Sequence, residues 1–393
     1  MSVQKSFVTD KIQNMPPSGI RKFFDVAKEM KDVVSLGVGE PDFETPWNVR
    51  EEAIYHLEHG RTAYTSNAGS IELRKEIGRY MQRKYDLTYS YDDQILVTVG
   101  ASEGIDLAMR AVLDPGDEVL VVEPCYVSYR PCVTLAGGVP VSIATKAEND
   151  FRLTPEELLA AITPKTKALL LSYPNNPTGT IMGKSDLEKI AAVLREKNIL
   201  VISDEIYAEL TYAEERHTSI AALAGMYEKT LVLNGFSKAY AMTGWRLGYA
   251  CGPVDVIAAM TKIHQYVIMC ASTNAQHAGV EALRNNDNSV EEMRKAYDAR
   301  RRLLVHGFRA MGMDVFEPLG AFYVFPSIAV SGLQTEEFCT RMLFEEKVAV
   351  VPGNAFGDCG AGFVRCSYAY SLEDLRIALG RIETFLEKLE KGR

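Results

Sequence analysis

The sequence predicts an α/β fold in which a three-layer large domain, built on a mainly parallel sheet, is joined to a smaller α+β domain. From Ile95 to Leu233 short apolar runs alternate with helical segments, as expected for parallel strands covered by helices on both faces. Beyond Gly252 long helical segments come first and short strands follow, which indicates a second unit. We therefore expect residues 48–288 to form the large domain, and residues 1–47 and 289–393 to form the small domain.

The expected strands are apolar runs bounded by glycine, proline or polar residues. They cover residues 33–37, 95–99, 118–122, 139–144, 168–171, 199–203 and 230–233, and helical periodicity predicts helices over 48–59, 70–84, 102–113 and 185–197. Beyond residue 252 we expect helices over 254–269, 273–284, 289–311, 335–346 and 372–388, with strands at 314–317, 321–325, 348–351 and 363–367. In such a sheet, ligands bind at the carboxyl ends of the strands.

The composition excludes several classes of protein. The formal net charge of −9 argues against nucleic acid as a partner, because binding phosphates needs clustered lysine and arginine. Seven cysteines without a C-x-x-C pair favour reduced thiols in the cytoplasm, and no apolar run approaches the length of a membrane span. His56 and His59 share a helical face without further ligands, so we expect no metal site.

Lys238 is the first candidate for chemistry. It follows the apolar run Leu231–Leu233 in the segment Asn234-Gly235-Phe236-Ser237-Lys238, and burying an ammonium is costly unless it is paired or neutralised. A Schiff base with an aldehyde such as pyridoxal phosphate is one solution. A lysine whose stem reaches the surface is the ordinary alternative, and this segment alone leaves both open.

Two further strand ends carry polar residues. Ala101 and Ser102 follow the strand at 95–99 and open a helix, where free backbone N–H groups can receive a phosphate or Ser102 can simply cap the helix. Asp204 ends an apolar strand, where its carboxylate could keep a pyridine nitrogen protonated, with Tyr207 beside the ring oxygen. A capping aspartate beside a core tyrosine is the alternative reading.

Four other residues have a chemical and a structural interpretation. Asn176 lies in a loop that two prolines and a glycine fix after a strand, and Gly39 allows a backbone to approach a ligand closely. Arg365 is a lone guanidinium in an apolar strand, suited to forked binding of a carboxylate or to an ion pair. Tyr126 could stack on a flat ring or fill the core.

The order and spacing of these pieces resemble the class I and II pyridoxal-phosphate aminotransferases of fold type I. The likeness extends from Leu36-Gly37-Val38-Gly39-Glu40-Pro41-Asp42-Phe43 to the region after Arg365. The residues that carry it are, in chain order, Gly39, Tyr64, Gly100–Ser102, Tyr126, Asn176, Asp204, Tyr207, Lys238, Arg246 and Arg365.

The resemblance implies a role for each residue at the cofactor ring. Lys238 would form the Schiff base with pyridoxal 5'-phosphate and then carry the proton between the substrate Cα and the cofactor C4′. Asp204 would pair with the pyridinium nitrogen, Asn176 and Tyr207 would hold the ring oxygen, and Tyr126 would stack on the ring.

The resemblance also implies the residues at the two ends of the ligand. The phosphate would be bound by Ala101, Ser102, Ser237 and Arg246, and by Tyr64 from the partner subunit of a homodimer. The substrate α-carboxylate would be held by Arg365 with Gly39 and Asn176. Many relatives carry a phosphate-binding serine three positions before the lysine, where this chain has Gly235, so Ser237 is expected to serve instead.

The resemblance implies an aminotransferase that moves the amino group of an L-amino acid to a 2-oxo acid, with 2-oxoglutarate as the expected acceptor. The segment at residues 18–24 looks like the subgroup that accepts aspartate or aromatic amino acids. A C–S β-lyase or an aminocyclopropane-carboxylate-synthase-like lyase on the same scaffold is the alternative. A cofactor-sensing transcription regulator is disfavoured because the pattern begins within the first forty residues, and a nicotinamide dehydrogenase because no strand precedes G-x-G-x-x-G.

Overall fold

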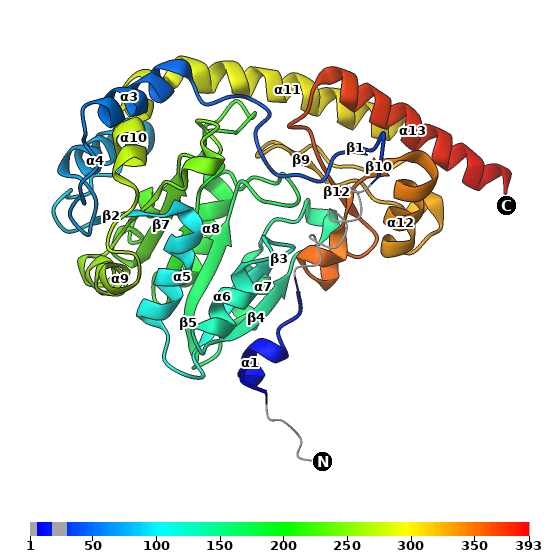
Figure 1. The fold of residues 1–393 in the computed structure, drawn as a ribbon. Coiled ribbons are helices and arrows are strands. Elements are labelled where there is room, and N and C mark those ends of the chain that lie inside the picture. Colours follow the sequence, from blue (N-terminus) through cyan, green and yellow to red (C-terminus); the bar gives the residue numbers. More distant parts are fainter. Residues whose placement is uncertain (1–5, 18–29, 393) are drawn as a thin grey trace, which may run out of the picture.

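The computed structural model describes residues 6–17 and 30–392, and its centre is a seven-stranded sheet (Figure 1). In spatial order the strands are β2 (Ile95–Thr98), β8 (Gly248–Cys251), β7 (Thr230–Gly235), β6 (Leu200–Asp204), β5 (Thr166–Ser172), β3 (Glu118–Glu123) and β4 (Val139–Ala144). β8 is antiparallel to β2 and β7, and the other neighbouring strands are parallel to one another. The expected α/β fold with a mainly parallel sheet is confirmed.

Helices cover both faces of this sheet because its strands are apolar on both sides. One face packs against α5 (Gly100–Val112), α6 (Tyr129–Leu135) and α9 (Val254–Val267). The other face packs against α7 (Pro155–Ala161) and α8 (Lys184–Leu194) in one region, and against α3 (Trp47–Glu58), α4 (Ile71–Tyr85) and α10 (Thr273–Asn285) in another. In β7, Leu231 and Leu233 face the first layer and Val232 faces the second, which explains the continuous apolar run.

The α+β part lies beyond the sheet, and α11 runs along the top of the molecule towards it (Figure 1). Its helices are α11 (Asp287–Ala310), α12 (Thr335–Glu346) and α13 (Leu372–Lys391), and its antiparallel sheet has the order β11 (Val351–Pro352), β12 (Val364–Ser367) and β9 (Tyr323–Val324). β1 (Val34–Ser35) pairs in parallel with β10 (Val348–Ala349), so a strand near the N-terminus lies beside one near the C-terminus. The domain boundaries at 47/48 and 288/289 stay a prediction.

Local expectations were wrong or incomplete in several places. The segment 314–317 is not a strand, because it forms no ladder, although the Asp314 carbonyl accepts a hydrogen bond from the Ser327 N–H at 2.8 Å. The seven-residue helices α6 and α7 were not expected. The sequence does contain a helix-start signal for α7, since Thr154 and Glu157 form a capping box and Pro155 lies in the first turn. A four-residue helix, α1 (Asp10–Gln13), also precedes β1.

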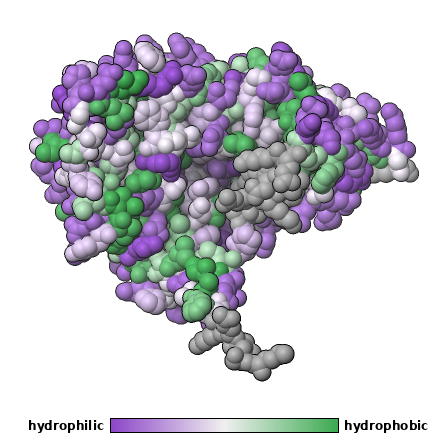
Figure 2. Space-filling view, viewed as in Figure 1, coloured by the Kyte–Doolittle hydropathy of each residue, from purple (hydrophilic) through white to green (hydrophobic). Residues whose placement is uncertain are grey.

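No helix in the described part of the chain is both long and apolar enough to span a membrane. On the face shown in Figure 2, hydrophilic residues are spread over most of the surface and hydrophobic residues gather in separate patches.

Gly248, the first residue of β8, allows this strand to touch the start of α5. A Cβ at position 248 would lie 2.5 Å from the Ala101 backbone nitrogen and from the Gly100 carbonyl carbon. Gly248→Ala is therefore expected to lower the free energy of unfolding in urea by about 1–3 kcal/mol, because strand and helix must move apart. Gly380→Ala is the control, since a Cβ there would meet nothing within 4 Å, and it is expected to stabilise by about 0.4–1 kcal/mol. Equal effects of the two substitutions would contradict the close approach.

Candidate active site

A cavity of about 2080 Å³ lies at the carboxyl ends of the parallel strands and is lined by both parts of the molecule. Nearly all the residues singled out in the sequence line it: Gly39, Ala101, Ser102, Tyr126, Asn176, Asp204, Tyr207, Ser237, Lys238, Arg246 and Arg365. Gly100 is not part of this lining, and neither is Tyr64, whose side chain is 81% exposed. One chain therefore brings together an amine, a carboxylate and several donors for anions.

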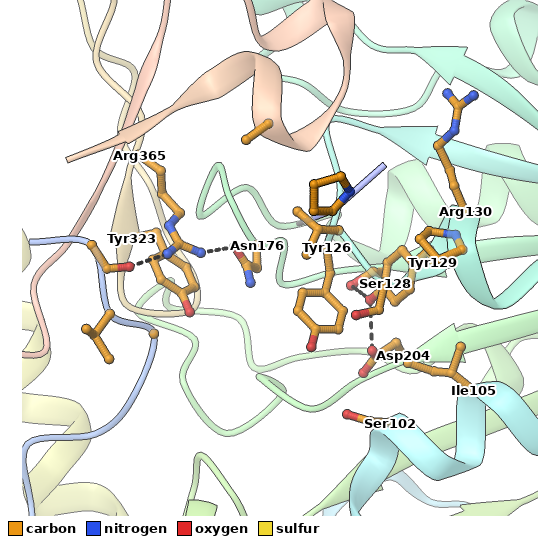
Figure 3. A pocket seen from close by; sticks show the side chains of 18 of the residues that line it. Ser102, Ile105, Tyr126, Ser128, Tyr129, Arg130, Asn176, Asp204, Tyr323 and Arg365 are labelled. Carbon is orange, nitrogen blue, oxygen red and sulfur yellow. Dashed lines mark hydrogen bonds between the residues drawn. The ribbon is translucent and has the colours of Figure 1, made fainter. Parts of the chain in front are cut away.

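Asp204 ends β6 with its carboxylate buried and held by hydrogen bonds. Its Oδ2 accepts a hydrogen bond from the Tyr129 hydroxyl at 2.8 Å, and its Oδ1 accepts the Ile206 N–H at 3.2 Å (Figure 3). The same Tyr129 oxygen lies 2.9 Å from the Ser172 hydroxyl. Burial raises the pKa of Asp204, while the hydrogen bonds from Tyr129 and Ile206 oppose that rise. A cation facing this carboxylate would relieve the cost of burying it.

Lys238 follows β7 and points into the cavity. Its Nζ donates to the Gly39 carbonyl oxygen at 2.7 Å and lies 5.8 Å and 5.7 Å from the ring centroids of Tyr207 and Phe322. Burial lowers the pKa of Lys238 to about 8, and the charge of Glu40 opposes this shift. A pKa of about 8 leaves roughly a tenth of the amine uncharged at pH 7, far more than the ordinary value of 10.5 would, and a nucleophilic amine must be uncharged.

Arg365, on β12, is buried between two aromatic rings. Its guanidinium carbon lies 4.5 Å from the centroid of Tyr323 and 4.9 Å from that of Phe356. One Nη donates to the Asn176 Oδ1 at 2.9 Å and the other to the Gly37 carbonyl (Figure 3). The Arg365 Nε has no hydrogen-bond partner among residues 6–17 and 30–392. A guanidinium fixed in this way at the wall of the cavity is suited to binding a carboxylate.

Tyr323 and Tyr129 are site residues that the sequence did not reveal. The Tyr323 hydroxyl lies 2.8 Å from that of Tyr207, and a Cβ at Gly39 would collide with it. Tyr323 thus connects Arg365 with Tyr207, as Tyr129 supports Asp204. No local pattern distinguishes these two tyrosines from core tyrosines.

The start of α5 forms a cradle with Arg246. Gly100, at φ +72°, is needed because a Cβ there would lie 2.5 Å from the Arg246 Nη2. Gly235 cannot be replaced by a larger residue without movement, since its Cβ would lie 2.9 Å from the Gly248 Cα and 3.0 Å from the Leu247 carbonyl oxygen. The backbone around position 235 therefore leaves too little room for a serine side chain, while Ser237 lines the cavity.

Within the described residues no group of histidine, cysteine and acidic side chains is arranged to hold a metal ion. His56 is buried and stacks on His277 with ring centroids 3.6 Å apart, so the helix α3 that carries it is not wholly a surface helix.

Comparison with known proteins decides the family. The protein-family model described as aminotransferase class I and II matches residues 31–382 of this chain. The chain belongs to this aminotransferase family. It is 52% identical to the Bacillus subtilis protein YugH, over 98% of this chain and 99% of that protein, and 46% identical to the aspartate aminotransferase of Pyrococcus abyssi, over 97% and 98%. The solved structure of Thermus thermophilus aspartate aminotransferase with maleate superposes with a TM-score of 0.92 at 41% identity, over 97% of this chain and 100% of that one.

Members of this family use pyridoxal phosphate, and this aminotransferase is a pyridoxal-phosphate-dependent enzyme. The cavity fits that cofactor. It holds an amine of lowered pKa in Lys238, a buried carboxylate in Asp204 and a cradle at the start of α5 that a Cβ at Gly100 would obstruct. These groups match an aldehyde, a ring nitrogen and a phosphate.

The lowered pKa of Lys238 predicts how the apoenzyme takes up pyridoxal phosphate. Only the uncharged amine condenses with an aldehyde, so the rate should rise with pH and level off above about pH 8, rather than near 10.5. Because the charge of Glu40 raises this pKa, Glu40→Gln should move the midpoint to lower pH. Stopped-flow absorbance measures the rate, and a midpoint near pH 10 would contradict the lowered pKa.

The hydrogen bond from Tyr129 to Asp204 predicts that removing the Tyr129 hydroxyl lowers catalytic activity. Tyr129→Phe is expected to reduce kcat/KM about tenfold to a hundredfold, because a hydrogen bond to a buried charge contributes about 1.5–3 kcal/mol. Tyr89→Phe is the matched control, since the buried Tyr89 hydroxyl has no partner in the described residues. Steady-state kinetics of both variants make the comparison, and a Tyr129→Phe enzyme as active as Tyr89→Phe would refute the role.

Proposed function

We propose that this aminotransferase transfers the amino group of aspartate or of an aromatic L-amino acid to a 2-oxo acid, with 2-oxoglutarate as the acceptor. The observation that carries the proposal is the single cavity shared by Lys238, Asp204 and Arg365. Transamination needs an amine that can be exchanged, a stabilised negative charge at Cα and an anchor that orients the bond to be broken.

We assign the chemistry at Cα to Lys238. When bound, pyridoxal phosphate supplies a ring that takes up the electron pair left at the substrate Cα. Lys238 would hold the cofactor aldehyde carbon, yield it to the substrate amine, and then move the proton from Cα to C4′. The lowered pKa of Lys238 supports this, because a base must be uncharged before it can accept a proton.

The residues around the ring would fix its charge and its plane. Asp204 would face the ring nitrogen and favour its protonated form, because an opposite charge close to a carboxylate stabilises both charged groups. Tyr207 and Asn176 would hold the ring oxygen, and Tyr126 would stack on the ring. Figure 3 supports this placement, since the Tyr126 side chain lies between Asn176 and the pair of Tyr129 and Asp204.

The two ends of the ligand would be held by opposite parts of the molecule. Ala101, Ser102, Ser237 and Arg246 would bind the phosphate at the start of α5, where backbone N–H groups are free. Arg365 would bind the substrate α-carboxylate together with Gly39 and Asn176. The place of Arg365 in the cavity lining, with one Nη held by Asn176, supports this assignment.

We further propose a cytoplasmic homodimer in which Tyr64 reaches the partner subunit's phosphate site. Tyr64 is exposed, and exposed apolar side chains at Tyr266, Val267 and Met269 lie close in the fold, because the Asn67 amide donates to the Met269 carbonyl at 2.8 Å. Such a gathering of apolar side chains favours an interface. Sedimentation of the active enzyme tests this, and a monomer with full activity would contradict it.

The choice of donor rests on the relatives. The relative from Pyrococcus abyssi is named an aspartate aminotransferase. A further relative, from Thermococcus litoralis at 43% identity, is named an aromatic-amino-acid aminotransferase. The segment at residues 18–24, which first suggested this subgroup, lies outside the described residues. These names do not favour the lyase alternative.

A panel of amino donors tests the proposal. With 2-oxoglutarate, we expect aspartate or an aromatic amino acid to give glutamate in a one-to-one ratio with the donor's 2-oxo acid. Lys238→Ala should lose about 10,000-fold or more in rate, because it lacks the base, whereas the exposed control Lys262→Ala should not. Release of pyruvate or of a cyclised product without any acceptor would indicate a lyase instead.

A further inference from the structure

Glu103 lies one residue beyond the phosphate cradle, but its side chain does not line the cavity. Ala101, Ser102 and Ile105 from the same turns of α5 line it, and Figure 3 shows Ser102 at the start of this helix, close to Asp204. The Glu103 carboxylate instead reaches back to accept the backbone N–H of Val99, the residue before α5. This hydrogen bond fixes the turn between β2 and α5, much as the glutamate of a capping box does.

The other oxygen of Glu103 contacts a buried histidine on a neighbouring helix. Glu103 Oε1 lies 2.7 Å from Nδ1 of His264, which belongs to α9 and is fully buried. A carboxylate accepts hydrogen bonds, so Nδ1 is the donor. The other ring nitrogen, Nε2, has no hydrogen-bond partner in the described parts of the chain, so Glu103 is the ring's hydrogen-bonding partner there. If the His264 ring served only to fill space in the core, an apolar ring would pack there equally well.

The charge of Glu103 makes its orientation matter. An acidic side chain is favourable in the first turn of a helix, but a carboxylate turned towards a bound phosphate dianion would repel it. The hydrogen bond from His264 holds the carboxylate towards α9. It thereby keeps the Glu103 carboxylate from competing with a ligand at Ala101 and Ser102, which line the cavity.

We propose that Glu103 and His264 are positioning residues for the phosphate end of the cofactor site. Together they fix the first turn of α5 and keep its acidic side chain away from the phosphate. The inference rests on the proposed position of the phosphate at Ala101, Ser102 and Arg246. A residue that only stabilised the fold would affect every ligand of the cavity alike, whereas these two affect the phosphate.

The test compares binding of pyridoxal phosphate with binding of pyridoxal, which lacks the phosphate, to the apoenzyme. His264→Phe keeps an aromatic ring but removes the donor, and we expect the Kd for pyridoxal phosphate to rise about tenfold while the Kd for pyridoxal changes less than about twofold. His264→Gln retains a donor and should recover most of the affinity. Absorbance titration reports both constants without requiring turnover.

Two further variants separate the possible outcomes. Met260→Ala loosens the packing of the same helix, takes no part in the hydrogen bonds of Glu103, and should change both constants by the same factor. Arg246→Ala should raise the Kd for pyridoxal phosphate if the cradle is placed correctly. An effect of Arg246→Ala with none of His264→Phe overturns only the role of Glu103 and His264, whereas no effect of Arg246→Ala overturns the phosphate position itself.

If His264→Phe does not fold, Glu103→Asp gives the same comparison, because it shortens the carboxylate by one methylene and cannot make both hydrogen bonds. A selective loss of pyridoxal phosphate affinity supports the proposal. An equal loss for both ligands, or no loss, contradicts it.

Discussion

The buried carboxylate of Asp204 is the constraint on which the site depends. Burial of an acidic group at the end of an apolar strand is expensive, and the hydrogen bonds from Tyr129 and Ile206 offset only part of that cost. A cation opposite Asp204 would complete the compensation. The parallel sheet fixes where that cation must lie, because β5, β6 and β7 all end at the same edge, next to the turn that carries Lys238.

The two proposed anion sites are set apart by the fold rather than by any single loop. Arg246 and the start of α5 lie in the part of the molecule that is built on the seven-stranded sheet, whereas Arg365 belongs to β12 in the α+β part. The aromatic pair Tyr207 and Tyr323 joins the two parts by a hydrogen bond across the cavity. A ligand with an anionic group at each end would therefore meet a donor from each part, as the proposed binding of a phosphate and a carboxylate requires.

Most of the fold could be predicted because apolar runs that end in a polar residue mark the strands. The polar residues at those strand ends stayed ambiguous one by one, and the expectation that Asp204 and Lys238 share a site came from the resemblance to the aminotransferase family. Tyr129 and Tyr323 were missed because their roles depend on partners distant in sequence, at Asp204 and Tyr207. The crowding at Gly235 could likewise not be predicted from the sequence, because Gly248, whose backbone fills the space, belongs to another strand, β8.

The most direct test of the account is to locate the covalent attachment of the cofactor. Borohydride reduces the double bond between a lysine and pyridoxal phosphate to a stable amine, which peptide mass spectrometry can place on one residue. The account predicts a single phosphopyridoxyl group on Lys238, and none on the other lysines. Attachment to a different lysine, or a protein that gains no label, would contradict it.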